Sequence, residues 1–446
     1  MSKVVGIRRE DKNRWERRTP LIPNHCLELK KTQKINFIIQ PSKIRIFSDE
    51  DYFSVGVKVQ EDLAECDCIF GIKEMPVDFF LPKKTYIFFA HVIKGQAHNM
   101  PMLNKMLELG CNLIDYEKIT DEQGKRLIFF GHYAGLAGMI DTLWALGQRL
   151  ENEGIVSPFS ELRPTIHYEN LAQAKQAVTK VGKKIEEEGL HPALVPLVCG
   201  ITGYGNVSRG AQEIFDLLPF TEIKPKELGE FFARKDFSKY RVYKTVFYEE
   251  DTVARLNQST GQTLSLFDLK DYYAHPEKYK SVFERYVPYL TVLVNCIYWD
   301  SRYPRLVTKN FLKLLYKAEP RLRVIGDISC DIEGSIEATV KTTSPDNPVY
   351  VYDPIRNRAI DGVIGNGPVI MAIDNLPCEL AQEASIYFSN VLKPYVGQIA
   401  QADFTVPFAK LKLPSEIKRG VIVYQGELTP DYKYIQQYLR NDKEQK

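Results

Sequence analysis

Short runs of β-branched and aromatic residues alternate with segments of helical periodicity along most of this chain, starting at residue 4. Such alternation is typical of parallel sheets joined by crossover helices and unlike the strand-after-strand pattern of a sandwich. Residues 99–109 carry apolar side chains at helical spacing between two expected strands. The pattern predicts a first α/β domain over about the first 140 residues. Its strands are expected at residues 4–7, 35–40, 68–73, 86–90, 112–115 and 126–130.

The composition argues against several classes of binding partner. With 59 Lys and Arg against 57 Asp and Glu, the net charge of +2 is far from the basic excess that binding to a nucleic acid backbone requires. The longest apolar runs, near residues 86–93 and 286–299, are shorter than the ~20 residues that span a bilayer. The eight cysteines are too dilute for a disulfide framework, so buried thiols are expected, and the scattered histidines form no metal-ligand pattern. We therefore expect neither a nucleic acid, a membrane nor a metal ion as a partner.

A long helical segment at residues 133–150 follows the first domain. It carries Asp141, which argues against a membrane span and favours a buried helix between domains. Its small side chains permit close packing of a neighbouring backbone: Ala134, Gly135, Ala137 and Gly138.

A second α/β unit is expected to begin after an amphipathic helix at residues 171–188, with a strand at 194–199. Residues 225–320 depart from simple alternation of strands and helices. They are rich in Tyr, Phe and Lys, so an ordered insertion is expected there. Regular alternation resumes with strands near 323–328 and 349–352.

A glycine-rich loop connects the expected strand at 194–199 to a helical sequence. Glycines at such a turn let the backbone approach a pyrophosphate, whose charge then lies at the positive end of the helix. The third position of the GxGxxG pattern is Ser208, with Gly210 two residues later, and tight turns also need glycine for purely steric reasons. The placement nevertheless predicts a dinucleotide site. Its expected residues are Gly203, Tyr204, Gly205, Asn206, Val207 and Ser208.

The next strand is expected near residues 220–223, where NAD enzymes commonly place an acidic residue for the ribose 2′-hydroxyl. Here Glu222 competes with Lys224 and Lys226 for that role. Because a lysine can bind a 2′-phosphate, Lys224 favours NADPH. The alternative is a solvated surface lysine.

Polar side chains follow several strands of the first domain. The carboxyl ends of parallel strands meet at one edge of a sheet, where ligands gather. A lysine and a histidine in one partly buried cleft are suited to proton transfer at a carbonyl or imine. The alternatives are a core histidine and a solvated lysine. The side chains at these strand ends are Arg8, Arg9, Glu10, Lys73, Glu74, His91, Asp115 and Glu117.

Two arginine sites suggest an anionic substrate. Arg17 and Arg18 lie on the loop after the first strand, and Arg126 lies at the last expected strand of the domain. Guanidinium groups bind carboxylates in a bidentate manner, so a dicarboxylate substrate is plausible. The alternative is that each arginine holds a carboxylate of a neighbouring loop.

Eight stretches of the chain together resemble the lysine-2-oxoglutarate reductase half of animal aminoadipic semialdehyde synthase. More distantly they are similar to saccharopine dehydrogenases and the alanine dehydrogenase group. The resemblance runs from about residue 3 to 439, without the saccharopine dehydrogenase half, so either a monofunctional enzyme or an excised domain is expected. The stretches are GIRREDKNRWERRTPL, GIKEMP, FFAHVIKGQAHNM, LIDYEKITDEQGKRL, TGYGNVSRGAQEIF, GDISCDIEGSIE, IDNLP and DYKYIQ.

The resemblance implies an α/β fold of two Rossmann-like domains with parallel sheets and an interdomain catalytic cleft. Residues 1–140 and 378–446 would form a discontinuous substrate and catalytic domain. Residues 141–377 would bind the dinucleotide and contain the insertion near 225–320.

The resemblance also assigns roles to individual residues. Lys73 and His91 match the acid/base pair of the saccharopine dehydrogenase type. The remaining matches fall into three groups: Glu74 and Glu117 as carboxylates that tune this pair and meet the cationic groups of lysine, Arg18 and Arg126 as dicarboxylate ligands, and Asp331 and Asn375 beside the nicotinamide.

The implied function is NADPH-dependent reductive condensation of L-lysine with 2-oxoglutarate to saccharopine, in lysine degradation, with a saccharopine dehydrogenase domain or protein acting on the product. The alternatives are an NAD-dependent saccharopine dehydrogenase or amino-acid dehydrogenase, and a nucleotide-binding regulatory module without catalysis. The resemblance implies a mitochondrial protein. A cytoplasmic one is the alternative, because Glu10 and Asp11 close behind Arg8 and Arg9 are untypical of a presequence.

Overall fold

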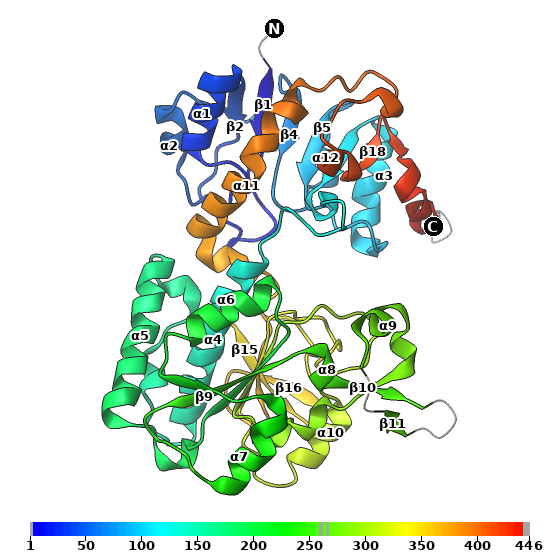
Figure 1. The fold of residues 1–446 in the computed structure, drawn as a ribbon. Coiled ribbons are helices and arrows are strands. Elements are labelled where there is room, and N and C mark those ends of the chain that lie inside the picture. Colours follow the sequence, from blue (N-terminus) through cyan, green and yellow to red (C-terminus); the bar gives the residue numbers. More distant parts are fainter. Residues whose placement is uncertain (1–2, 258–261, 265–266, 440–446) are drawn as a thin grey trace. The chain divides into compact units, whose positions relative to one another are not determined.

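The computed structural model describes residues 3–257, 262–264 and 267–439. The chain divides into two compact units, Met1–Phe130 with Ala381–Lys446 and Gly131–Leu380. Each unit is built around its own mostly parallel sheet, which confirms the predicted α/β class (Figure 1). The boundary expected at residue 140 lies inside helix α4 (Gly131–Asn152), which belongs as a whole to the second unit.

The first sheet has the order β19-β18-β6-β5-β4-β1-β2-β3. Strands β1 to β6 run parallel, and the C-terminal strands β18 and β19 add an antiparallel hairpin beside β6. The strands are β1 (Val4–Ile7), β2 (Asn36–Ile39), β3 (Lys58–Val59), β4 (Cys68–Phe70), β5 (Thr85–Phe88), β6 (Asn112–Asp115), β18 (Val421–Tyr424) and β19 (Glu427–Leu428).

The prediction of a strand at residues 126–130 is wrong. Arg126 makes only an isolated bridge to Thr120, and the edge position beside β6 is taken by β18. The apolar character of this segment comes from helix packing: Ile128 is buried, and the ring of Phe130 stacks on Phe388 with centroids 4.6 Å apart. The apolar run at residues 126–130 therefore indicated burial but not a strand.

Helices from both ends of the chain cover the first sheet. Helix α1 begins with Pro23, whose missing N–H costs nothing at a helix start, and Lys34 follows its end with a left-handed φ of 56°. Helix α1 packs against α11, so the orange C-terminal segment lies beside the blue N-terminal one (Figure 1). The helices are α1 (Pro23–Gln33), α2 (Asp49–Ser54), α3 (Met100–Glu108), α11 (Ala381–Gln401), α12 (Ser415–Arg419) and α13 (Gln436–Leu439).

The second sheet has the order β16-β15-β17-β14-β13-β7-β9-β8, parallel from β8 to β17 and antiparallel at β15 and β16. The chain leaves β7, forms the outer strand β8 and returns to form β9 directly beside β7. The strands are β7 (Val198–Thr202), β8 (Phe220–Glu222), β9 (Val242–Phe247), β13 (Val292–Asn295), β14 (Val324–Asp327), β15 (Val349–Asp353), β16 (Arg358–Asp361) and β17 (Val369–Met371).

Strand β7 begins four residues later than the expected start at 194. Residues Pro192–Leu194 form a 3-10 turn, and Pro196 has no N–H to donate to a sheet. Alternate side chains of the strands then enter different cores: Val292 and Val294 pack on one face of the sheet, and Leu293 packs on the other.

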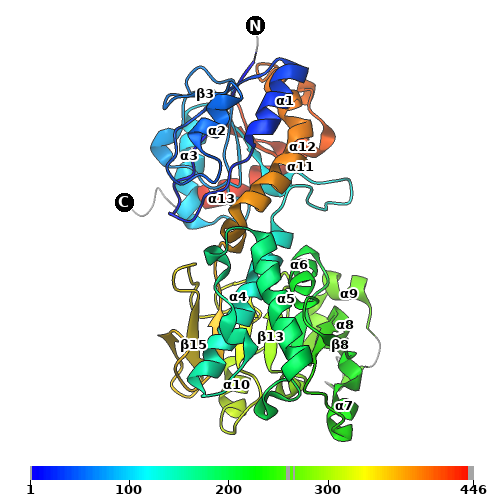
Figure 2. The same ribbon diagram turned by 90° about the vertical axis from the view of Figure 1, so that its left-hand side faces the viewer.

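Helices cover both faces of the second sheet (Figure 2). On one face, α4 and α6 approach closely because Gly135 and Gly210 lack side chains. A Cβ on Gly135 would overlap the carbonyl of Val207, and one on Gly210 would overlap that of His132. The first face carries α4, α5 (Leu171–Glu188) and α6 (Asn206–Phe215), and the second carries α7 (Leu228–Arg234) and α10 (Lys309–Leu315).

The insertion is shorter than the expected 225–320, because that range contains β9 and β13 of the main sheet. The added part is a three-stranded antiparallel sheet with its own small aromatic cluster, which includes Tyr272 and Tyr279. Its elements are α8 (Glu249–Thr252), β10 (Val253–Leu256), β11 (Thr263–Leu264), α9 (Leu269–Ala274) and β12 (Tyr279–Ser281).

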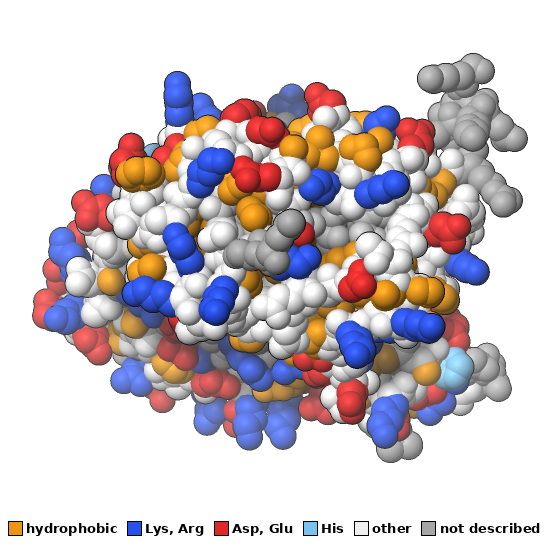
Figure 3. Space-filling view, turned by 90° about the horizontal axis from the view of Figure 1, so that it is seen from above, with side chains coloured by type: hydrophobic (Ala, Val, Ile, Leu, Met, Phe, Trp, Pro, Cys, Tyr) orange, Lys and Arg blue, Asp and Glu red, His pale blue; other side chains and the backbone are white. Residues whose placement is uncertain are grey.

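Several expectations from composition can be compared with the structure. All eight cysteines are buried and carry free thiols, as predicted. On the face drawn in Figure 3, basic and acidic side chains are interspersed, in keeping with the net charge of +2. Within the described residues, every helix is too short or too polar to cross a bilayer.

Candidate active site

The carboxyl ends of β1, β4, β5 and β6 lie at one edge of the first sheet, because these strands are parallel neighbours. Ionisable side chains follow each of these strands within three residues. The structure therefore brings together side chains from Arg8 to Glu117 that are distant in the sequence.

Glu74 connects a histidine and a lysine at this edge. Its Oε1 lies 2.6 Å from Nδ1 of His91, and Nζ of Lys12 lies 3.1 Å from its Oε2. Burial opposes ionisation of this carboxyl group. The hydrogen bond and charge of His91, with the charge of Lys12, outweigh it and hold the pKa of Glu74 well below its ordinary value. Glu74 is therefore a fixed negative charge that orients the imidazole.

The backbone of His91 is held in an uncommon conformation. Its φ is +48°, in the left-handed region that few non-glycine residues adopt. The Asn99 side chain donates to the His91 carbonyl over 3.1 Å, and the Phe89 ring stacks on the imidazole with centroids 6.1 Å apart. Strain of this kind persists where surrounding contacts require it, which is typical of functional sites.

Lys73 lies beside this pair, directly before Glu74, and is largely buried. Burial and then the positive charge of Arg18 lower the pKa of Lys73. Its backbone is anchored by Glu10, whose carboxylate accepts the N–H groups of Ile72 over 2.7 Å and Lys73 over 2.9 Å. A lysine with a lowered pKa can act as a base near neutral pH.

Glu10 is a site residue that the sequence alone did not single out for a role. It is buried, and burial followed by the negative charge of Glu16 raises the pKa of Glu10 to about 7. The signal was present in the sequence only as an acidic residue after the first strand. Its partner groups are backbone atoms 62 and 63 residues away.

Arg18 is not presented as an open ligand for a substrate carboxylate. Its Nε and Nη2 donate to Glu16 over 2.8 and 2.5 Å, both side chains are buried, and the guanidinium lies 4.2 Å from the centre of the Phe130 ring. The structure thus favours the alternative in which the arginine holds a loop carboxylate. The positive charge of Arg18 still lowers the pKa of Lys73.

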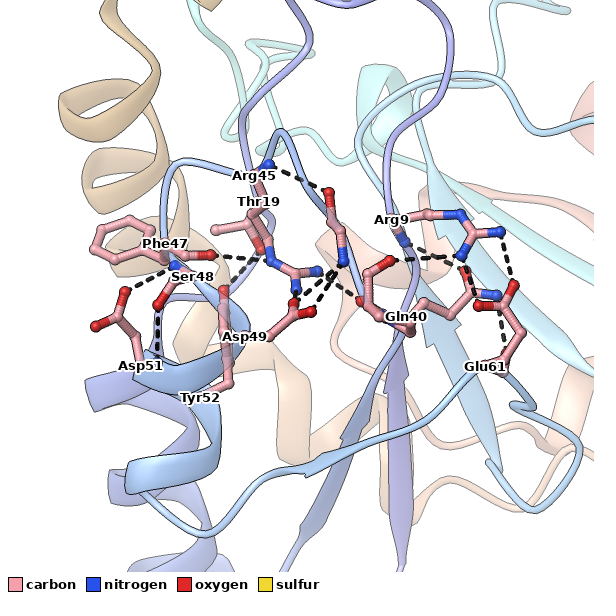
Figure 4. Close-up of polar contacts among 12 residues, drawn as sticks. Arg9, Thr19, Gln40, Arg45, Phe47, Ser48, Asp49, Asp51, Tyr52 and Glu61 are labelled. Atoms are coloured by element: carbon pink, nitrogen blue, oxygen red, sulfur yellow. Dashed lines mark hydrogen bonds and ion pairs between the residues drawn. The ribbon is translucent and has the colours of Figure 1, made fainter.

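A polar network fixes the loop that carries this ion pair (Figure 4). The Thr19 hydroxyl lies 2.9 Å from the hydroxyl of Tyr52, which donates to the carbonyl of Leu21 over 2.5 Å. Arg45 lies over the Tyr52 ring, donates to the carbonyl of Gln40 over 3.0 Å and pairs with Asp49. The network ties the loop after β1 to the loop after β2.

Glu117 and Arg126 form an ion pair of 2.9 Å at the end of β6. The side chain of Arg126 is half exposed, whereas that of Glu117 is mostly buried. Below them, Asp115 accepts the N–H of Glu117 over 2.9 Å, and burial followed by the charge of Glu117 raises the pKa of Asp115 to about 8. Two of the predicted substrate ligands therefore bind each other in this structure.

The glycine loop of the second unit fits a dinucleotide pyrophosphate. Gly203 has a φ of +84°, and a Cβ on Gly205 would have no neighbour within 4 Å, so the backbone before α6 is open to a ligand. Ser208 occupies the third glycine position. It is buried, and its hydroxyl accepts from the Gln212 side chain over 3.0 Å. Val207 packs on α4, and Asn206 begins α6.

A cavity of about 410 Å³ begins at this loop. It lies beyond the ends of β7, β9 and β13, and the short insertion supplies part of its wall. Lys224 is not part of this wall, since it lies exposed after the outer strand β8. The wall includes Gly203, Tyr204, Gly205, Tyr248, Glu249, Tyr273, Trp299 and Arg305.

Asp331 and Asn375 also lie outside the lining of this cavity among the described residues. Asp331 is exposed on the loop after β14, and Asn375 is buried in the turn after β17. Asp327, which sequence analysis did not identify as a candidate, positions the loop of Asp331. Asp327 accepts from Asn295 over 2.8 Å and from Thr339 over 2.5 Å, and burial raises its pKa to about 6.

Comparisons with known proteins identify the domains and the fold of this chain. A family model described as "Alanine dehydrogenase/PNT, N-terminal domain" matches residues 6–137, and one described as "Alanine dehydrogenase/PNT, C-terminal domain" matches residues 250–431. A solved structure of an L-alanine dehydrogenase is 16% identical and covers 98% of this chain and 99% of its own, with a TM-score of 0.62. A transhydrogenase from Sinorhizobium meliloti is 14% identical and covers 96% of this chain and 100% of its own, with a TM-score of 0.55.

Curated relatives share more of the sequence. Alpha-aminoadipic semialdehyde synthase of Arabidopsis thaliana is 42% identical over 99% of this chain and 42% of the relative. The mitochondrial protein of that name from Rattus norvegicus is 38% identical over 99% of this chain and 48% of the relative. This chain thus spans less than half the length of both. Saccharopine dehydrogenase [NAD(+), L-lysine-forming] of Emericella nidulans is 27% identical over 89% of this chain and 92% of the relative.

Proposed function

The chain belongs to the alanine dehydrogenase/PNT family, both of whose domains it contains, and from this premise we propose that it is a lysine-2-oxoglutarate reductase. The reaction would join L-lysine and 2-oxoglutarate to saccharopine, a step of lysine degradation, at the expense of a reduced nicotinamide dinucleotide. It consumes one proton and releases one water. The synthase relatives support the substrates, and the glycine-loop cavity supports the coenzyme.

The observation that carries the proposal is the convergence of Lys73 and His91 at one sheet edge. The ε-amine of the substrate attacks the 2-oxo carbon, and the resulting carbinolamine loses water to an imine. Each step moves a proton, and Lys73, with its lowered pKa, is suited to accept one. Glu74 engages Nδ1 of His91, which leaves Nε2 of that ring as the atom that exchanges a proton with the substrate.

When bound, the dinucleotide supplies the hydride that reduces the imine. Backbone N–H groups of the loop from Gly203 to Gly205 and the first turn of α6 would hold its pyrophosphate. Asp331 and Asn375 remain proposed contacts of the nicotinamide half.

Glu117 and Arg126 are the proposed substrate ligands. Their ion pair supplies one charge of each sign at the site edge, and the half-exposed Arg126 is open to solvent on one side. We propose that this arginine exchanges Glu117 for a carboxylate of 2-oxoglutarate, while Glu117 meets a cationic group of lysine. Arg18 contributes through its charge on Lys73, because its guanidinium is engaged by Glu16.

The proposal also includes the coenzyme used, the cellular compartment and the enzyme that acts on the product. The expectation of NADPH came from Lys224 and from the resemblance to the reductase half. Lys224 lies exposed after the outer strand β8, so the proposal of NADPH now rests on the resemblance. The rat relative is named as mitochondrial, and we propose the same compartment for this chain. Saccharopine would pass to a saccharopine dehydrogenase domain or protein.

A substrate panel tests the proposal. The chain is incubated with lysine plus 2-oxoglutarate, with pyruvate plus ammonia, and with saccharopine plus oxidised dinucleotide, each with both coenzymes. Absorbance at the dihydronicotinamide band and mass spectrometry of the product are measured. Saccharopine formed from the first mixture supports the proposal. Turnover confined to ammonia would indicate an amino-acid dehydrogenase, and dinucleotide binding without turnover would indicate a regulatory module.

A further inference from the structure

We propose that Asn99 is a positioning residue that holds His91 in the conformation from which its imidazole reaches Glu74. The inference rests on the proposed function, since it assumes that His91 transfers a proton. Asn99 would act through the backbone of His91 and not by contact with a substrate. Neither a motif nor the spacing of the sequence indicated a role for this residue.

The conformation of His91 persists only if a neighbouring group holds it. Its φ of +48° differs from the negative φ that residues other than glycine ordinarily adopt. In this conformation, Nδ1 of the imidazole lies 2.6 Å from Oε1 of Glu74. Because the direction of the Cα–Cβ bond follows the backbone, a return to negative φ would move the ring away from Glu74.

The Asn99 side chain supplies this contact from a rigid base. Its Nδ2 donates to the His91 carbonyl over 3.1 Å and so connects the two ends of the loop between β5 and α3. Asn99 is buried and stands directly before α3, whose side chains Met100, Leu103 and Met106 lie in the core of the first unit. One hydrogen bond therefore fixes the carbonyl of His91 to that core.

The start of α3 does not need the Asn99 side chain. Asparagine is common before a helix because its side chain accepts an N–H of the first turn. At Asn99 the backbone is close to helical, with φ of −100° and ψ of −7°, and the side chain makes no such bond. The N–H of Met100 donates to the carbonyl of Ala97, and Pro101 has no N–H. The contact with His91 is thus the reason for this side chain.

Asn99 also lies at the proposed site. With Glu74, Lys12 and His98, it lines a cavity of about 410 Å³ in the first unit. A substrate in this cavity could touch the amide directly, so the experiment has to separate a positioning role from a binding role.

Asn99→Asp makes this separation. Aspartate has nearly the same shape and is equally common before a helix, but an ionised carboxylate cannot donate to the His91 carbonyl. With lysine, 2-oxoglutarate and the reduced dinucleotide, we expect kcat to fall by roughly 10- to 100-fold, since small displacements of a catalytic group cost that much. KM for both substrates should change by less than ~3-fold. Asn104→Asp, inside α3, is the matched control and should show wild-type kinetics.

A double-mutant cycle identifies the group through which Asn99 acts. In the His91→Gln background, Asn99→Asp should lower kcat by less than ~2-fold, because the side chain that it positions is gone. An equal loss in both backgrounds would overturn the inference, as would an unchanged kcat in Asn99→Asp. A rise in KM alone would also overturn it, because Asn99 would then bind substrate. If Asn99→Asp is unfolded by circular dichroism, the shorter Asn99→Ser takes its place in the cycle.

A measurement without substrate distinguishes a failed inference from a failed function. Deuterium exchange at the imidazole carbon between the two ring nitrogens of His91 is followed by mass spectrometry of peptic fragments. Its rate should differ by at least ~2-fold between Asn99→Asp and the wild type, since the ring loses its contacts with Glu74 and Phe89. Exchange at His25, on α1, should be equal in both proteins. An unchanged rate at His91 would overturn the inference, whatever the substrate panel shows.

Discussion

The two units place different chemistry at the same topological position. Each has a mostly parallel sheet with an antiparallel hairpin at one edge. In the first unit, the strand ends carry paired charges, such as Glu74 with His91 and Lys12. In the second, they carry glycine and aromatic side chains around a cavity. The comparison teaches that the same sheet edge can carry two kinds of candidate site, because the residues that follow the strands differ.

The double variant Lys73→Met with His91→Gln should separate the proposed functions of the two units most clearly. Because each proton-transfer group is typically worth roughly 10²- to 10⁴-fold, we expect turnover to fall by at least ~10⁴-fold. Dinucleotide affinity should stay within ~2-fold, since the glycine loop belongs to the other unit. Steady-state kinetics and calorimetric titration measure the two effects. Retained turnover in the double variant would remove the proposed proton chemistry.

The converse variant, Gly205→Asp, should disable the second unit. A Cβ at this position has no neighbour within 4 Å, so folding should be unaffected. The added carboxylate would repel the pyrophosphate, and we expect dinucleotide affinity to fall by ~100-fold with an unchanged melting temperature. Gly205→Ala is the control and should lose much less affinity. Equal losses in both variants would show that steric contact, not charge, is responsible.

A smaller effect is expected from Glu10→Gln in the first unit. The amide can accept only one of the two N–H groups that the carboxylate holds, so the backbone of Lys73 should loosen and kcat should fall by ~10-fold. The wild-type pKa of Glu10, about 7, lies above its unfolded value. Stability from this group is therefore complete below about pH 4 and is lost as the pH rises through 7. Denaturation across this range should show a steeper loss of stability with rising pH in the wild type than in the variant.

The smallest expected effect concerns a buried carboxyl pair of the second unit. Asp141 on α4 and Glu379 are buried side by side. Burial and then the charge of Asp141 raise the pKa of Glu379 well above its ordinary value. Stability from Glu379 is thus present below about pH 4 and lost as the pH rises. Glu379→Gln should raise the free energy of unfolding by about 1–2 kcal/mol at pH 8 and by less at pH 5. Urea denaturation at both pH values measures it, and destabilisation at pH 8 would contradict it.

Local patterns predicted most strands and helices, because alternation and helical periodicity are local signals. They also predicted that strand ends would collect ionisable groups. The pattern failed at residues 126–130, where burial against Phe388 produced an apolar run without a strand. The ion pair of Glu16 and Arg18 joins residues only two positions apart, so it could have been predicted from the sequence. The hydrogen bonds of Glu10 join residues more than 60 positions apart, and no local pattern indicates them.

The order of strands was the main feature that local reasoning missed. The expected acid was sought near residue 222, about 20 residues after the loop. The chain instead forms the outer strand β8 first, so the strand directly beside β7 is β9, and Glu249 follows that strand at the cavity wall. The order in which the strands pair joins residues far apart in the sequence, and no single segment encodes it.

The first unit is completed by residues from the far end of the chain, since α11 packs on α1 and β18 pairs with β6. During synthesis, the continuous stretch from Gly131 to Leu380 leaves the ribosome whole, while strands β1 to β6 of the first sheet still lack the edge hairpin of β18 and β19. Until residues 381–446 emerge, β6 offers an unpaired edge to any other nascent strand. A chaperone that shields this edge would therefore act before β18 has been synthesised.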